Sequence, residues 1–121
     1  MTDYYLDTYA IIEIIKGNEN YKRFYKSKFF TSIYNLYELY YYLLRIHGKE
    51  IAKKYFFRFK KILINFNDNN IFLASEFKYN YSKRRVSYTD CLGYIISKDL
   101  NIKFLTGDKE FKDLENVEFV R

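Results

Sequence analysis

Apolar residues recur along the chain at two spacings, and the alternation between these spacings predicts the fold class. Short continuous apolar runs are typical of buried strands, whereas apolar residues three or four positions apart indicate one face of a helix. We expect strands at residues 4–7, 28–33, 62–66, 103–108 and 117–120, and helices at 8–16, 21–26, 35–47, 51–62, 68–85 and 87–100. Strands that alternate with helices in this way predict an α/β domain with a mostly parallel sheet of four or five strands, covered on both faces.

Polar residues and glycines indicate where the helices begin and end. Thr8 and Asn35 stand directly before apolar helical patterns, so we expect them to cap those helices, and Gly48 ends the second pattern. Ser87 and Asp90 are spaced to exchange capping hydrogen bonds at the start of the helix over 87–100. The chain has no proline and only four glycines, and no linker divides its 121 residues. We therefore expect a single domain over residues 1–121.

The composition indicates surfaces that meet a partner. The chain has 15 tyrosines and 12 phenylalanines, more than one small core readily encloses. Tyrosines occur around much of the helix over 36–47, so we expect this helix to be buried in a homodimer or under a partner protein. The single cysteine, Cys91, has no internal disulfide partner. The absence of a signal peptide and of a long apolar run predicts a cytoplasmic protein with no membrane segment.

The excess of basic residues favours polyanionic partners. The formal net charge is +6, and Lys83, Arg84 and Arg85 form a basic run shortly before Asp90. These three side chains are candidates for holding RNA phosphates, although a solvated helix end is the other interpretation. Charge alone does not decide between the two.

Four acidic residues are candidates for a metal site. Asp7 ends the first expected strand and Asp108 follows the fourth, and both ends point to the same edge of a parallel sheet. Glu38 and Asp90 fall in the first turns of helices that lead away from that edge. Clustered carboxylates repel one another, and a hard divalent cation with oxygen ligands relieves the repulsion. We therefore expect Mg²⁺ or Mn²⁺ there. The alternative roles are helix capping for Asp90 and Asp108, a helix-dipole interaction for Glu38, and hydrogen bonds to loop amides for Asp7.

At this point the sequence resembles a known family. The segments "YYLDTYAIIEI", "TSIYNLYEL", "SYTDCLGYIISKDLNIKFLTGDKEF" and "VEFV" are similar, in order, to the motifs of PIN-domain ribonucleases, particularly the small VapC-type toxins. The resemblance implies a three-layer α/β/α sandwich, metal-dependent endonucleolytic cleavage of RNA, and neutralisation by a cognate antitoxin. Asp7, Glu38, Asp90 and Asp108 fall on the family's acidic positions. Thr106 falls on the hydroxyl of the last motif and is expected to bond a water molecule beside the metal.

The resemblance also suggests a role for each part of the segment "TGDKEF". The strand delivers Asp108 to the metal site, Gly107 lets the backbone turn sharply, and Phe111 anchors the core. Two alternatives remain open. One is a PIN-like module that binds RNA or protein without cleavage. The other is a doubly wound phosphoacceptor or phosphatase domain, for which the sequence provides only Asp3 and Lys109 as supporting residues.

Overall fold

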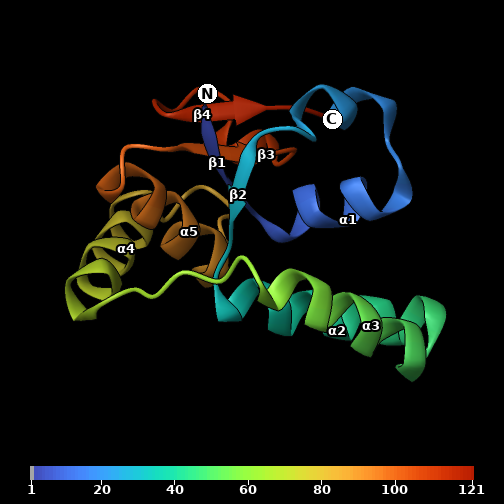
Figure 1. The fold of residues 1–121 in the computed structure, drawn as a ribbon. Coiled ribbons are helices and arrows are strands. Elements are labelled where there is room, and N and C mark those ends of the chain that lie inside the picture. The colour runs from blue at the N-terminus through green and yellow to red at the C-terminus, as the bar shows by residue number, and fades with distance from the viewer. Residues whose placement is uncertain (1) are drawn as a thin grey trace.

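The computed structural model describes residues 2–121 as strands and helices in alternation (Figure 1). In chain order the elements are β1 (Asp3–Leu6), α1 (Thr8–Lys16), the 3₁₀ helix η1 (Glu19–Phe24), β2 (Lys28–Phe30), α2 (Ile33–His47), α3 (Lys49–Lys60), α4 (Asp68–Asn80), α5 (Tyr88–Asp99), β3 (Lys103–Thr106), the 3₁₀ helix η2 (Lys109–Phe111) and β4 (Val117–Phe119). The α/β class expected from the sequence is confirmed.

The four strands form one parallel sheet in the order β2-β1-β3-β4. From β1 the chain passes to β2 on one side, and it later returns to β3 on the other side. The boundary between β1 and β3 is therefore the point where the strand order reverses, which is where ligands bind in open parallel sheets. Leu6 of β1 pairs with Leu105 of β3, so the two strands end level with each other.

The strand predicted at residues 62–66 is not present. Only a single bridge joins Leu63 to Thr31, just beyond the end of β2. The backbone N–H of Ile64 donates to the carbonyl of Thr31 at 2.9 Å, and after this the chain turns away from the sheet. The cause is Asn67, whose side chain accepts from the N–H of Asn70 in a capping box and starts α4. The apolar run is therefore a connection with one bridge.

Helices cover both faces of the sheet and make it the middle of three layers. In Figure 1, α4 and α5 lie on one side, and α1 with the α2–α3 hairpin lies on the other. Successive strand residues point to opposite faces. Tyr4 and Leu6 pack in the apolar cluster of α1, α2 and α3, whereas Tyr5 and Phe104 pack in the cluster of α4 and α5. Phe111 is fully buried in this second cluster, as the sequence predicted.

Three helix termini differ from the expectation. Asp7 caps α1, because its carboxylate accepts from the N–H of Ala10, and Thr8 is the first helical residue. Ser32 precedes α2, so Asn35 lies inside the helix instead of capping it. Helix α4 ends at Asn80 and does not extend through residue 85. At α5, Ser87 accepts from the N–H of Asp90 at 3.0 Å, which is one of the two capping bonds predicted there.

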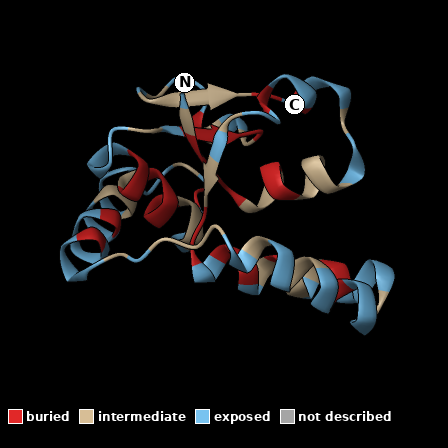
Figure 2. Ribbon diagram, in the orientation of Figure 1, coloured by how far each residue is buried: buried red, intermediate tan, exposed pale blue. Residues whose placement is uncertain are grey.

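The α2–α3 hairpin projects from the body of the molecule with its outer faces exposed (Figures 1 and 2). Tyr37 and Tyr41 on α2, and Phe57 on α3, each expose more than half of their accessible surface. Part of the aromatic excess noted in the sequence is therefore exposed on this hairpin. Across residues 2–121 the helices are too short or too polar to span a membrane.

Candidate active site

The candidate site lies where β1 and β3 end. Asp7 follows β1 directly, and its backbone N–H donates to the carbonyl of Leu105 at 3.3 Å. Thr106 ends β3 and therefore stands beside Asp7, and Asp108 follows two residues later. The first strand and the "KFLTGD" strand are neighbours in the sheet, and this pairing places both aspartates at one edge of the sheet.

Asp7 is almost completely buried and is held by two donors. Its Oδ1 accepts from the N–H of Ala10 at 2.8 Å, and its Oδ2 accepts a very short hydrogen bond from the hydroxyl of Thr106. Both bonds favour the ionised carboxylate. Even so, burial and the charges of Asp90 and Asp108 raise the pKa of Asp7 well above its usual value. Burial, together with the repulsion from neighbouring acids, therefore outweighs two favourable hydrogen bonds.

Asp90 is the acidic residue whose charge interacts with those of the other three. It lies in the first turn of α5, and its pKa is raised to about 7, first by burial and then by the charges of Glu38 and Asp108. The Asp90 charge in turn raises the pKa of Asp7. The fold thus brings all four predicted carboxylates within electrostatic range of one another. They come from the end of β1, from α2, from α5 and from the loop after β3.

Glu38 is held by a hydrogen-bond network that the sequence did not reveal. The hydroxyl of Thr8 donates to Glu38 at 2.6 Å, and the side-chain N–H of Asn35 donates to that hydroxyl at 3.1 Å. The Asn35 side-chain oxygen accepts from Tyr5 at 2.6 Å and from Ser32 at 3.0 Å. This network connects the sheet to the acidic site. Asn35 is fully buried. An asparagine within an apolar helix pattern is the only sequence signal of this network, and that pattern predicts a helix cap.

Asp108 is held by hydrogen bonds to residues two positions before and after it in the chain. Its N–H donates to the hydroxyl of Thr106 at 3.0 Å, and its Oδ1 accepts from the N–H of Glu110 at 3.0 Å, which starts η2. Thr106 therefore contacts both strand-end aspartates, as donor to Asp7 and as acceptor from Asp108. The predicted role of this hydroxyl in bonding a water molecule stays a prediction.

Gly107 is required for a different reason from the one predicted. Its φ is not among the positive values of the chain, so its conformation does not demand glycine. Instead, the ring of Tyr9 packs against its α-carbon, and an added Cβ would lie 2.1 Å from Cε1 of Tyr9. The carbonyl of Gly107 also accepts from Nε of Arg121 at 3.0 Å. The glycine therefore permits a close approach of Tyr9 to the loop that carries Asp108.

The chemistry of the four carboxylates fits a hard divalent cation. They are oxygen-only donors, and the charges that raise the pKa of Asp7 and of Asp90 show the repulsion that such a cation neutralises. Within residues 2–121, no three acidic, histidine or cysteine side chains are grouped tightly enough to hold a metal ion as they stand. Asp7, Glu38 and Asp108 instead accept hydrogen bonds from Ala10 and Thr106, from Thr8 and from Glu110 respectively.

The basic run at 83–85 is only partly available to a ligand. Arg84 forms an ion pair with Asp113 at 3.1 Å and also donates to the carbonyl of Glu110 at 2.5 Å. The Arg84 guanidinium is therefore engaged within the protein. A phosphate-binding role stays a prediction for Lys83 and Arg85.

The protein is a three-layer α/β/α domain with acidic residues at the point where the strand order of its parallel sheet reverses. Its family follows from the sequence, which matches the PIN domain over residues 4–117. The chain belongs to the PIN domain family. The doubly wound phosphoacceptor alternative has no comparable support.

Solved structures of similar fold come from several bacteria. The chain is 22% identical to Mycobacterium tuberculosis VapC20, described as a toxin that cleaves the sarcin-ricin loop, with a TM-score of 0.76 and coverage of 98% of each chain. It is 16% identical to a chain of DNA-bound VapBC from Salmonella typhimurium, with a TM-score of 0.76 and coverage of 99% of this chain and 98% of that one. For VapBC2 of Rickettsia felis, bound to a promoter DNA fragment, the identity is 20%, the TM-score 0.73 and the coverage 98% of each chain. A comparison with curated proteins gave no match.

Proposed function

We propose that this protein is an endoribonuclease that depends on Mg²⁺ or Mn²⁺. The observation that supports the proposal best is the raised pKa of two buried carboxylates at the switch point of the sheet. Burial and the charges of Asp90 and Asp108 raise the pKa of Asp7, and burial and the charges of Glu38 and Asp108 raise that of Asp90. Like charges are kept this close at a cost in stability, and function is the usual reason for such an arrangement. The match to the PIN domain family supports nuclease chemistry.

In this proposal the four carboxylates hold the cation, and the surrounding residues fix the carboxylates. A divalent cation bound there supplies positive charge to the substrate phosphate and promotes the ionisation of water. Thr106 orients Asp7 by donating to its Oδ2, and Thr8 orients Glu38 by donating to its Oε1. Burial of Tyr5 raises the pKa of its phenol, so Tyr5 stays protonated and keeps donating to Asn35 behind Thr8.

The substrate we propose is RNA, and the biological role is that of a toxin paired with an antitoxin. The net charge of +6 attracts a polyanion without reading its sequence. Solved structures of similar fold include VapBC complexes and a toxin described as cleaving the sarcin-ricin loop. The exposed aromatic residues of the α2–α3 hairpin offer a surface for an antitoxin or for a second copy of the chain.

Cleavage of single-stranded RNA by the purified protein tests the proposed reaction. We expect cleavage with Mg²⁺ or Mn²⁺, loss of cleavage with excess chelator, and at least a 100-fold lower rate in Asp108→Asn, which removes one ligand charge. Asp68→Asn is the matched control, because Asp68 is an exposed aspartate at the start of α4 and should leave the rate unchanged. RNA that is bound but stays intact with both metals would favour the non-catalytic PIN-like module.

Sedimentation and purification from the native host test the partners. We expect a homodimer, or a complex with a small protein that protects the aromatic residues of the α2–α3 hairpin from solvent. A monodisperse monomer that captures no partner contradicts this part of the proposal and leaves the nuclease assay unaffected.

A further inference from the structure

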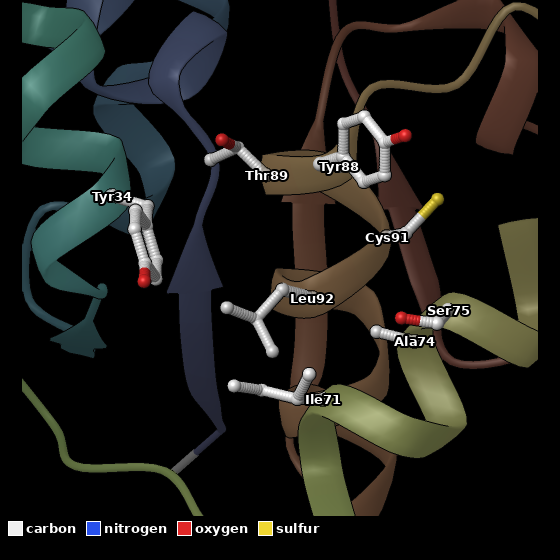
Figure 3. A pocket seen from close by; sticks show the side chains of 8 residues that line it. All are labelled: Tyr34, Ile71, Ala74, Ser75, Tyr88, Thr89, Cys91 and Leu92. Carbon is white, nitrogen blue, oxygen red and sulfur yellow. The ribbon is translucent and has the colours of Figure 1, made fainter. Parts of the chain in front are cut away.

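A small cavity of about 170 Å³ lies between α2, α4 and α5. Tyr34 of α2 forms one wall, and Ile71 of α4 and Leu92 of α5 extend toward it from the other side (Figure 3). Tyr88 and Thr89 line the end nearest the start of α5. None of the lining residues is charged, so the cavity chemistry differs sharply from that of the acidic site.

The cavity shares two helices with the acidic site. Tyr34 precedes Glu38 by four residues on α2, and residues at this spacing lie on the same helix face one turn apart. On α5, Thr89 and Cys91 line the cavity and flank Asp90 in sequence. A polymer whose phosphate is held by a divalent cation at Asp90 and Glu38 is therefore positioned to place an attached group in this cavity.

The lining favours a flat aromatic ring. Tyr34 and Tyr88 expose 45% and 77% of their surfaces, so both offer ring area for stacking. The hydroxyls of Ser75 and Thr89 can each donate or accept a hydrogen bond. Pockets for drug-sized ligands span roughly 300–1,000 Å³, so a cavity of this size suits a single ring system.

A cation stands just beyond the aromatic rim. The ammonium of Lys78 lies 4.8 Å from the ring centroid of Tyr88 and donates to the carbonyl of Val86 at 2.5 Å. An ammonium has three N–H donors, so two remain for a ligand. A second, more open cavity lined by Lys78 and Ser82 shares Tyr88 with the first. The order along the surface is therefore acidic site, aromatic cavity, then lysine. In a nucleotide chain each ribose carries one base and is joined to a phosphate on either side, so a base in the cavity leaves one phosphate for the acidic site and the other for the lysine.

We propose that this cavity binds one nucleobase of single-stranded RNA beside the bond held at the acidic site. The inference rests on the proposed function for its choice of polymer. A protein side chain is the other conceivable occupant, but the uncharged aromatic walls between a candidate cation site and a lysine favour a nucleotide. Since both hydroxyls donate and accept, the cavity selects by ring size and stacking more than by the hydrogen-bonding pattern of the base.

Binding to matched oligomers tests the inference without any need for cleavage. Fluorescence anisotropy with Ca²⁺, which like Mg²⁺ takes oxygen ligands, compares a ten-nucleotide single-stranded RNA with an abasic ribose-phosphate oligomer of equal length and charge. We expect the parent to bind the RNA about 10-fold more tightly than the abasic oligomer. Tyr34→Ala and Tyr88→Ala should each reduce this preference several-fold and leave affinity for the abasic oligomer unchanged. Tyr25→Ala is the control, because Tyr25 is 46% exposed and lies outside the cavity.

The outcomes separate this inference from the proposed reaction. Thermal melts of every variant exclude loss of folding as a cause, since Tyr34 also contacts Phe66 with ring centroids 5.7 Å apart. Equal affinity of the parent for both oligomers, or an undiminished preference in both cavity variants, overturns the inference even if the protein cleaves RNA. A preference that depends on Tyr34 and Tyr88 in a protein that cleaves nothing supports the base site while the nuclease proposal fails.

Discussion

Replacing Asp90 by asparagine should stabilise the protein in the absence of metal. The pKa of Asp90 is raised from its usual value of 3.8 to about 7 by burial, by Glu38 and by Asp108. The folded state therefore binds more protons than the unfolded state between these two values, and stability falls as the pH rises through this range. Above pH 7 the parent carries the full electrostatic penalty, which an asparagine does not.

The size of the effect follows from the pKa difference. A pKa raised from 3.8 to about 7 corresponds to about 4 kcal/mol of unfolding free energy at 1.36 kcal/mol per pKa unit. Because the Asp90 side chain keeps some contact with solvent, screening reduces the expected gain to about 2 kcal/mol. For a chain of 121 residues this raises the melting temperature by about 6–10 °C at pH 8. At pH 4 and below, parent and variant should melt within about 2 °C of each other.

The assay is thermal unfolding followed by circular dichroism from pH 4 to pH 8, with chelator present. Asp68→Asn is the control, since it removes a first-turn aspartate from α4 and should only lose a helix-dipole interaction of about 0.3–1 kcal/mol. Added Mn²⁺ should stabilise the parent more than Asp90→Asn, because the cation binds the folded state through the charge that the variant lacks. A variant that is less stable than the parent at pH 8, or a difference that does not change with pH, would refute the reasoning.

Two further substitutions test the supports of the site by thermal unfolding. Gly107→Ala should destabilise the protein by about 1–3 kcal/mol, because the added Cβ meets the Tyr9 ring. The loss should be smaller in a Tyr9→Ala background, and equal losses in both backgrounds would contradict the close-contact explanation. Asn35→Ala should lower the free energy of unfolding by about 2–4 kcal/mol, because it breaks buried hydrogen bonds with Tyr5 and Thr8. Asn65→Ala is the control, because Asn65 is exposed and its loss should be less than about 0.5 kcal/mol. Similar losses at both positions would show that the network contributes little.

The sequence predicted the fold because its strongest patterns are local. The apolar runs of β1, β3 and β4 and the helical periodicity of α2, α3 and α5 each reflect burial on one or two faces, which a short window of residues records. The run at 62–66 was equally apolar but formed no strand. Whether such a run joins a sheet depends on the partner backbone, and here Asn67 starts a helix before a second bridge can form.

The site was predictable as a set of acidic residues, but its supports were not. Asp7 and Asp108 follow strands that end at one sheet edge, a placement that strand order alone determines. The network from Tyr5 through Asn35 to Thr8 joins residues 30 and 27 positions apart, and no local spacing encodes it. The reason for Gly107 is also non-local, because it depends on where Tyr9 of another element places its ring.

Helix capping and metal binding are not competing explanations for these aspartates. Asp108 starts η2, as the capping alternative predicted, and Asp7 caps α1, which the sequence did not predict. Capping places a carboxylate at the N-terminus of a helix, and in a parallel α/β sheet that terminus lies at the carboxyl end of the preceding strand. The same bond that starts the helix therefore delivers the carboxylate to the ligand-binding edge. What a set of incidental caps does not require is that neighbouring carboxylates raise the pKa of Asp7 and of Asp90, and this repulsion is what a bound divalent cation would remove.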